Sequence, residues 1–514
     1  MNVSPLGIAT ATLAGSVPTQ RCPVGSGQLL AACRLAWELG GQLVALWASD
    51  ERDHERGYCL RVLLKDSDGL TLLEHTLPDE GARYPDLATI FPAANRMQRA
   101  AFDLVGVQCD ADDQRPWAWQ AAWPIDQFPL RRDFVASPKW EPGQEDYSFV
   151  RVAGDGVHEI PVGPVHAGII EPGHFRFQVV GEKVLRLEER LAYVHKGIEK
   201  RFEAFSLDDG HRLAGRVSGD STVAYAWAYA QAVEAITGIG VPARAAGLRA
   251  LCLERERIAN HLGDLGYLGN DAGFAFGLAQ FSRLREDVLR LNAQSLGHRL
   301  LMDVVVPGGV AHDLGPGAAD ALRAQGESLA REIQVLRNIY DEHAGVQDRF
   351  RNCGQVTREL ATRLGLTGLA GRASGVADDL RSDFPAPPYD ELAVRKITHT
   401  TGDVAARVAV RFDEIFESLR LTEALLESLP AGAIGASLPD RPAPGLALGA
   451  VEGWRGPVVI GLETGPDRTI RRCHPHDPSW QNWPVLEHAV IGNIVPDFPL
   501  INKSFNLSYS GHDL

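Results

Sequence analysis

Four long segments with helical spacing of apolar residues occupy the middle of this 514-residue chain. They cover approximately residues 243–262, 280–300, 317–340 and 404–429. In the first segment Pro242 stands at the start, and Leu248, Leu251 and Leu262 recur on one helical face. Because an apolar stripe of this kind has to be buried against another element, the spacing predicts a four-helix core between residues 190 and 430.

The flanking regions carry shorter signals of mixed type. Residues 25–40 have helical spacing, and strand-like runs follow at 42–48, 58–64 and 71–77. Further along, the runs 175–180 and 183–187 are typical of a β-hairpin around Gly181-Glu182. Residues 435–514 return to β-like and irregular sequence.

These patterns predict an α+β protein with two domains. A small N-terminal α/β domain is expected at 1–135, followed by a linker at 136–147 that is rich in proline and charge. The remaining residues, 148–514, are expected to form a mostly helical domain with peripheral β-hairpins.

Composition and charge exclude several classes of protein. Hydrophobic residues make up 45% and charged residues 23%, as in globular proteins. The net charge of −15 argues against a nucleic-acid partner, because phosphate recognition needs clustered Lys and Arg. No stretch approaches the ~20 apolar residues that span a bilayer, and the first thirty residues lack a signal peptide's basic segment. Any membrane association is therefore expected through partner subunits.

Seven cysteines stand singly along the chain, and none has CxxC spacing to another. They are Cys22, Cys33, Cys59, Cys109, Cys252, Cys353 and Cys473. A scattered, odd set is typical of reduced thiols rather than of a disulfide framework. It also excludes a conventional metal or cluster site built from local cysteine pairs.

Short motifs in the N-terminal part resemble the 30-kDa-type (C) subunit of respiratory complex I. The motifs are Tyr84-Pro85-Asp86-Leu87, Ile90-Phe91-Pro92, Ala94-Asn95, Gln98-Arg99, Phe102-Asp103-Leu104 and the segment Phe128–Phe134. The last of these is similar to the Pro-Leu-Arg-Lys-Asp signature that closes this family's domain.

Motifs in the larger part resemble the 49-kDa-type (D) subunit and the large subunits of membrane-bound [NiFe] hydrogenases. They are Gly163–His166, Glu171–Arg176, Tyr193–Lys200, Gly297–Arg299, Pro307–Val310, Arg372–Gly375 and Asn482–Leu486. The fused arrangement is most similar to the large subunit of formate hydrogenlyase, of the hydrogenase-3 and hydrogenase-4 type. Each motif alone has an ordinary structural explanation, but their agreement in order along nearly the whole chain does not.

The resemblance implies two CxxC pairs that hold nickel and iron, since soft thiolates suit these metals. Here the four ligand positions are occupied by Ser218, Ser221, Ser508 and Gly511. Neutral hydroxyls are weak, hard ligands, and glycine offers none. The sequence also ends three residues after Gly511, so we expect it to lack the extension that hydrogenases remove after nickel insertion. We therefore expect no metal bound by this chain and no hydrogen activation.

In complex I the same pocket binds quinone, and the resemblance implies a histidine and a tyrosine that serve as proton donors. His174 stands at the histidine position and is the candidate for quinone or proton handling, with an ordinary loop histidine as the alternative. The tyrosine position is Gly219, so Tyr225 and Tyr509 are the candidates to replace it. Tyr225 also replaces a family histidine that follows the first CxxC pair.

Four charged residues are further candidates for the pocket. Arg455 matches an arginine that hydrogenases place beside the iron. We expect Asp220 and Glu452 to pair with Arg216 or Arg455 and to fill the vacated site with ion pairs. A purely structural role for all four is the alternative.

The resemblance implies a subunit of a membrane-associated respiratory-type oxidoreductase complex that works without a [NiFe] centre. Its partners would be a small iron-sulfur subunit that holds a [4Fe-4S] cluster and membrane-embedded complex I-like subunits, with this chain on the cytoplasmic side of the inner membrane. Arg372 and Arg381 would lie at the interface with the iron-sulfur subunit. The alternatives are a quinone-reducing NADH dehydrogenase core, in which the pocket binds quinone, and a non-catalytic assembly subunit.

Overall fold

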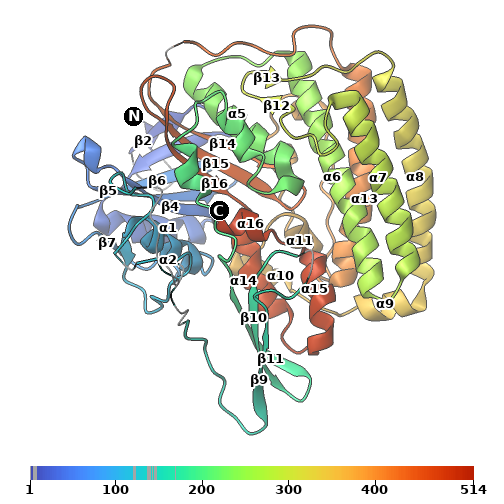
Figure 1. Ribbon diagram of the computed structural model, residues 1–514, viewed down its shortest axis with the longest axis horizontal. Helices are drawn as coiled ribbons and strands as arrows, with labels where there is room; N and C mark the ends of the chain where they lie inside the picture. Colours follow the sequence, from blue (N-terminus) through green and yellow to red (C-terminus); the bar gives the residue numbers. More distant parts are fainter. Residues whose placement is uncertain are drawn as a thin grey trace.

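The computed structural model describes residues 2–3, 9–119, 123–124, 126–135, 141, 143, 147–167, 170–440 and 442–514. Most of the expected linker, residues 136–147, lies outside the described residues. The expected α+β class is confirmed, because an N-terminal sheet, a helical bundle and several smaller sheets occupy separate parts of the molecule (Figure 1).

A six-stranded sheet forms the centre of the N-terminal domain. Its order is β1-β2-β3-β6-β5-β4, and β3 and β6 are the parallel pair within it. The strands are β1 (Asn2–Val3), β2 (Ala9–Leu13), β3 (Thr19–Pro23), β4 (Gln42–Asp50), β5 (Tyr58–Lys65) and β6 (Leu70–Leu77). Helices α1 (Ser26–Glu38) and α2 (Ala94–Val105) and the short pair β7 (Arg83–Tyr84) and β8 (Gln108–Cys109) complete the domain. The helix and the three strands expected here are confirmed.

Strand β4 is buried on both faces and joins the two halves of the molecule. Leu46 and Ala48 belong to the core cluster that contains α2, whereas Ala45 and Trp47 pack against the C-terminal sheet. This alternation follows from the two-residue period of a strand. It explains why the sequence of β4 is apolar at nearly every position.

A three-stranded antiparallel sheet projects from the body of the molecule (Figure 1). Its strands are β9 (Val157–Val162), β10 (His174–Val180) and β11 (Lys183–Arg190). The expected hairpin around Gly181-Glu182 is confirmed as β10–β11. The β9–β10 connection, residues 163–173, starts one wall of the cleft described below.

The four-helix core is confirmed. It consists of α6 (Ala243–Asp271), α7 (Ala275–Leu296), α8 (Ala318–Glu342) and α13 (Val404–Ser428), which lie side by side in Figure 1. Helix α6 continues nine residues beyond the expected end at 262. Helix α5 (Thr222–Thr237) packs on the C-terminal sheet instead of joining the bundle.

Short elements connect these parts. They are α3 (Ile198–Phe202), α4 (Gly210–Ala214), the 3-10 turn η2 (Gly219–Ser221), β12 (Val305–Val306), β13 (Gly309–Val310), α9 (Ala344–Phe350), α10 (Arg358–Leu364), α11 (Gly368–Ala373) and α12 (Leu380–Asp383).

The C-terminal region is more regular than the sequence indicated. Strands β14 (Leu446–Glu452), β15 (Pro457–Thr464) and β16 (Ile470–His476) form an antiparallel sheet. The following residues, described above as β-like and irregular, instead form α14 (Ser479–Ala489), α15 (Phe498–Phe505) and α16 (Tyr509–Asp513). The interpretation was wrong here because prolines and short helix lengths hide the 3.6-residue period.

Candidate functional site

Two loops far apart in sequence meet at the positions expected for metal ligands. The first contains Ser218 and the turn η2, which leads directly into α5. The second begins after Asn506, whose left-handed backbone (φ 46°) ends α15 and turns the chain toward Ser508. Ser508 is the N-cap of α16, and its side chain accepts a hydrogen bond from the backbone N–H of Gly511.

A directed chain of hydrogen bonds crosses from one loop to the other. The hydroxyl oxygens of Ser218 and Ser508 lie 2.8 Å apart, and the Ser218 hydroxyl donates to Oδ1 of Asp220 at 2.8 Å. Because a hydroxyl has one proton to donate, Ser508 must be the donor to Ser218. The chain therefore runs from the Gly511 N–H through both serines to the Asp220 carboxylate.

Arg455 neutralises this carboxylate. Its guanidinium donates to Asp220 Oδ1 at 2.9 Å and to the Ser221 hydroxyl at 3.3 Å. Burial opposes ionisation of Asp220, but the charge of Arg455 outweighs it and lowers the pKa of the carboxyl. The expected pairing of Asp220 with Arg455 is thus present in the structure.

Behind the serines, a second polar cluster surrounds Gly511. The buried phenol of Tyr225 donates to Oδ2 of Asp477 at 2.7 Å, and Oδ1 of Asp477 accepts from the Ser479 N–H. A Cβ atom at position 511 would lie 2.5 Å from Asp477 Oδ2. Position 511 therefore has no room for a side chain unless Asp477 moves.

A cleft of about 680 Å³ opens in front of the two loops. Ser218, Gly219, Asp220, Arg455 and Ser508 line its inner end. Its walls come from the β9–β10 connection, the end of α6 and the helices α15 and α16, through residues that include His166, Ile170, Glu171, Tyr267, Asn270, Asp271, Asn502, Lys503 and Tyr509.

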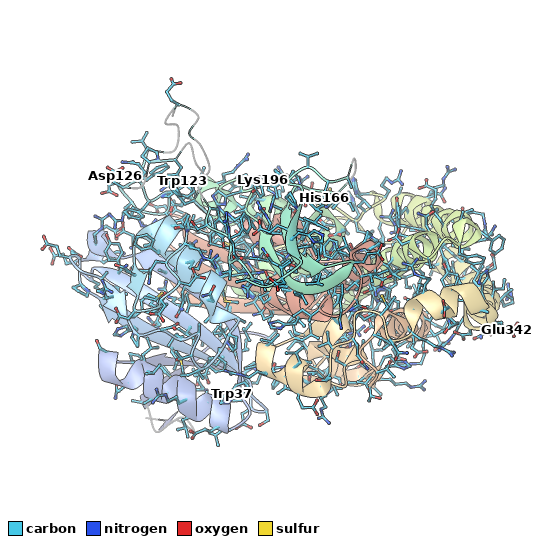
Figure 2. The ribbon with its side chains drawn as sticks, turned by 90° about the horizontal axis from the view of Figure 1, so that it is seen from below. Trp37, Trp123, Asp126, His166, Lys196 and Glu342 are labelled. Carbon is cyan, nitrogen blue, oxygen red and sulfur yellow. The ribbon has the colours of Figure 1, made fainter. Side chains whose placement is uncertain are left out.

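Tyr509 and His166 face each other across one wall of this cleft. The Tyr509 hydroxyl lies 3.5 Å from Nε2 of His166, and burial raises the pKa of the phenol above its ordinary value. Figure 2 shows His166 beside the projecting β9–β11 sheet. The connection that carries it is fixed to α16, because Glu171 accepts the Ser510 N–H at 3.0 Å.

His174 is not among the described residues that line the cleft. It is the first residue of β10, it is 8% exposed, and Nε of Arg176 donates to its Nε2 at 3.3 Å. Its ring packs on Phe149 at 4.9 Å. The sequence placed His174 at a loop tip, whereas strand pairing with Arg190 draws it into the β9–β11 sheet.

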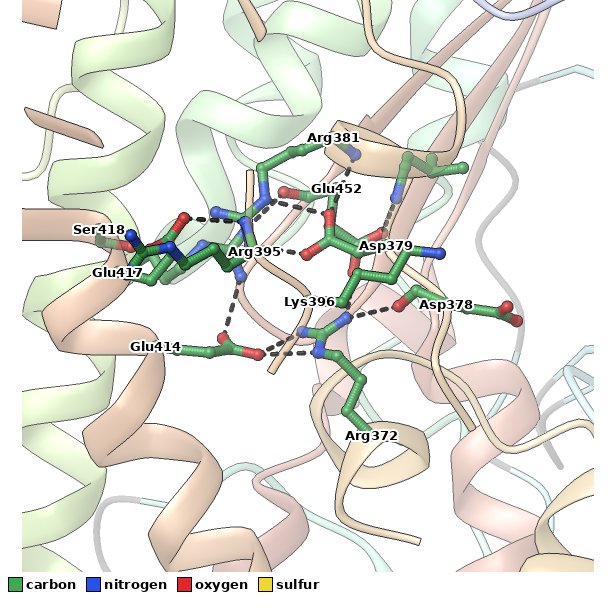
Figure 3. Close-up of polar contacts among 12 residues, drawn as sticks. Arg372, Asp378, Asp379, Arg381, Arg395, Lys396, Glu414, Glu417, Ser418 and Glu452 are labelled. Carbon is green, nitrogen blue, oxygen red and sulfur yellow. Dashed lines mark hydrogen bonds and ion pairs between the residues drawn. The ribbon is translucent and has the colours of Figure 1, made fainter. Parts of the chain in front are cut away.

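Two of the expected pocket residues lie elsewhere. Arg216 forms an exposed ion pair with Asp303, at 2.6 Å, instead of pairing with Asp220 or Glu452. Glu452 lies inside the protein, where Nη1 of Arg372 donates to it at 2.9 Å (Figure 3). The expectation for these two was wrong because a nearer partner of opposite charge is available to each.

The buried network around Glu452 also corrects the interpretation of Arg372 and Arg381. Both arginines are buried, at 0% and 5% exposure, and Figure 3 shows them among the carboxylates of Glu414 and Asp379. Fully enclosed side chains of this kind stabilise the packing between elements and are not available to a partner surface.

Sequence reasoning missed His166, Asp271 and Lys503 as cleft residues. His166 belongs to the motif Gly163–His166 and was detectable, because the motif precedes a predicted strand and so lies in a connection. Asp271 and Lys503 carried no such signal, since they meet only when α6 and α15 pack together. Burial raises the pKa of Asp271 despite the nearby Lys503.

Within the described part of the chain, no group of three His, Cys, Asp or Glu side chains is arranged to hold a metal ion. Likewise, none of the described helices is both long and apolar enough to span a membrane.

Two family models match the chain. Residues 23–139 match the 30-kDa subunit of respiratory-chain NADH dehydrogenase, and residues 271–444 match its 49-kDa subunit. Formate hydrogenlyase subunit 5 of Escherichia coli (strain K12) is 31% identical over 93% of this chain and 86% of its own length. Hydrogenase-4 component G of the same strain is 32% identical over 93% and 85%. The chain belongs to this family of fused complex I-type subunits.

Other members of the family extend the comparison to quinone-linked enzymes. The fused C/D subunit of NADH-quinone oxidoreductase from Bacteroides fragilis is 29% identical over 77% of this chain and 78% of its own length. Among solved structures, a chain of the membrane-bound sulfane sulfur reductase, an archaeal respiratory membrane complex, superposes with a TM-score of 0.67 at 26% identity. It covers 71% of this chain and all of its own length. The protein is thus an oxidoreductase subunit of the complex I-related class.

Proposed function

We propose that this family member transfers electrons within a membrane-associated respiratory-type complex and does so without a [NiFe] centre. The observation that carries the proposal is the occupancy of the four ligand positions. Ser218 and Ser508 bond each other, Ser221 bonds Arg455, and Gly511 lies against Asp477. Each position is committed to a protein contact, and none supplies a thiolate.

The environment of Gly511 supports the same proposal. Asp477 is held by Tyr225 and by the backbone of Ser479, so it cannot easily make room for a larger residue at 511. A thiolate at this position would also face the Asp477 carboxylate, which opposes a second negative charge.

The cleft is the proposed site of the redox reaction. Its volume suits a small organic or inorganic electron acceptor. Tyr509 and His166 supply a protonated phenol and an imidazole on its wall, which are the groups that a two-electron, two-proton reduction requires. A quinone is the acceptor class that the relatives named NADH-quinone oxidoreductase favour.

The electrons are proposed to come from a partner, since the seven cysteines of this chain stand singly in its sequence. The rim of the cleft supports a partner surface there: Val165 is 79% exposed and Ile170 is 41% exposed. We assign this surface to a small iron-sulfur subunit whose [4Fe-4S] cluster would face the cleft. Membrane-embedded subunits would anchor the assembly on the cytoplasmic side of the inner membrane.

The test is metal analysis of the complex purified through a tag on this chain, from cells supplied with nickel. We expect iron from the partner's clusters, no stoichiometric nickel and no hydrogen-dependent dye reduction. A relative that retains the family's cysteines, purified in parallel, shows that the cells can insert nickel. One nickel per chain in this protein contradicts the proposal.

A further inference from the structure

A second, much smaller cavity lies at the junction between the N-terminal domain and the C-terminal segment. Its volume is about 30 Å³. Leu46, Met97 and Trp117 of the N-terminal domain line one side. The other side is formed by residues of α3, β16, α14 and α16, among them Glu199, His474, Trp480, His512 and Asp513. The cavity is separate from the cleft and shares no lining residue with it.

Four polar atoms from residues that line this cavity have no hydrogen-bond partner in the described part of the chain. They are Nε1 of Trp117, Nε2 of His474, Nε1 of Trp480 and Nε2 of His512. All four side chains are at least nine-tenths buried, with exposures of 1%, 7%, 7% and 1%. Buried polar atoms in native proteins are nearly always hydrogen-bonded, to protein or to ordered water.

The tautomers of the two histidines follow from their other ring nitrogens. Nδ1 of His474 lies 2.7 Å from the Glu199 carboxylate. Burial opposes the charge on Glu199, but Arg472 and His474 outweigh it and lower its pKa to about 2. The carboxylate is therefore an acceptor, Nδ1 carries the proton, and Nε2 of His474 is left as an acceptor.

The second histidine has the same arrangement. Nδ1 of His512 lies 2.9 Å from Oδ1 of Asp513, and burial lowers the pKa of the imidazole, so its ring is neutral. Nε2 of His512 is thus also an acceptor. The indole N–H groups of Trp117 and Trp480 can only donate.

Two donors and two acceptors around one cavity are the complement of water, which accepts two hydrogen bonds and donates two. A buried water needs a volume of about 10–15 Å³ and two to four polar partners, so the cavity has space for one or two. Cavities that stay dry are lined by apolar groups, unlike this one.

We propose that this cavity binds one or two water molecules that hydrogen-bond His474, His512, Trp117 and Trp480. The water joins the pairs Glu199–His474 and His512–Asp513 into one hydrogen-bonded chain. It also connects Trp117 of the N-terminal domain to α16, directly after the segment that carries Ser508 and Gly511. The interface between the two domains therefore includes water as a structural component.

The direct test is a map of the full chain at about 2 Å resolution or better. We expect density in the cavity at hydrogen-bond distance, about 2.7–3.2 Å, from the imidazole nitrogens and the indole nitrogens. A cavity without density contradicts the proposal. So does a peak at about 2 Å from an Nε2 atom together with a stoichiometric divalent metal, because that is a metal-ligand distance.

A second measurement does not depend on the map. Replacing Trp480 with β-(3-benzothienyl)alanine exchanges the indole N–H for sulfur and keeps the ring size. Loss of a donor to bound water should lower the melting temperature of the full chain by a few degrees. In a dry cavity the same change removes an unsatisfied donor, and the melting temperature stays equal or rises. The same replacement at Trp483, whose indole N–H donates to the Ser508 carbonyl at 3.2 Å, gives the loss expected for a satisfied donor.

Discussion

The hydroxyl of Ser218 lies 2.8 Å from the hydroxyl of Ser508, although 290 residues separate them in the chain. This contact joins the loop that precedes α5 to the loop that begins α16. It occupies the place where the resemblance to hydrogenases implies a pair of thiolates. The family's metal pocket is thereby replaced by a polar contact that stabilises the same junction.

Ser218→Ala and Ser508→Ala should each lower the free energy of unfolding by about 1–2 kcal/mol, because each leaves a buried polar atom without its partner. In a double-mutant cycle the two changes should couple by about 1 kcal/mol. Chemical denaturation of the full chain measures both quantities. Ser428→Ala, at an exposed hydroxyl on α13, is the control and should change little. Strict additivity of the two serine changes would show that the contact is not formed.

Asp220→Asn should lower stability by roughly 1–3 kcal/mol at pH 7, since Arg455 then remains buried without its countercharge. The expected loss is smaller than for a fully buried pair because the Asp220 side chain is 35% exposed. Chemical denaturation of the full chain at pH 7 measures it.

The same pair predicts a pH dependence. Arg455 holds the pKa of Asp220 below its unfolded value, so its stabilisation is complete above about pH 4 and is lost as pH falls through the folded-state pKa. The stability difference between wild type and Asp220→Asn should therefore shrink below about pH 4 in denaturation curves. A difference that stays constant down to about pH 2 contradicts this assignment.

Gly511→Ala should destabilise the chain by about 1–3 kcal/mol, because the new methyl group would lie 2.5 Å from Oδ2 of Asp477. Thermal unfolding provides the measurement. Gly315→Ala is the matched control, since nothing lies within 4 Å of a Cβ built there. If both variants melt at the wild-type temperature, Asp477 is free to move and position 511 is not crowded.

Tyr509→Phe should leave the complex assembled and reduce its turnover with a quinone acceptor by about 100-fold, the usual effect of removing a proton donor. His166→Asn should act in the same direction. His174→Asn is the informative comparison, because His174 is buried in the β9–β11 sheet and does not line the cleft. Turnover lost with His174→Asn but retained with Tyr509→Phe would return the proton-handling role to His174. Full turnover in all three assembled variants would favour a non-catalytic subunit.

The sequence alone determined the helical bundle, the N-terminal sheet and the β10–β11 hairpin, because local periodicity records which face of each element is buried. It also determined that the ligand positions 218, 221, 508 and 511 carry no thiolate, because ligand chemistry depends on residue type.

Only the tertiary structure decided which charges pair. Arg216 and Arg455 are equally basic in the sequence, yet Arg216 meets Asp303 and Arg455 meets Asp220. Long-range partners depend on how α5, α6 and α16 pack, and a single residue's surroundings in the chain do not contain that information. For the same reason the candidate cleft histidine moved from His174 to His166, since strand register draws one imidazole inward and leaves the other beside Tyr509.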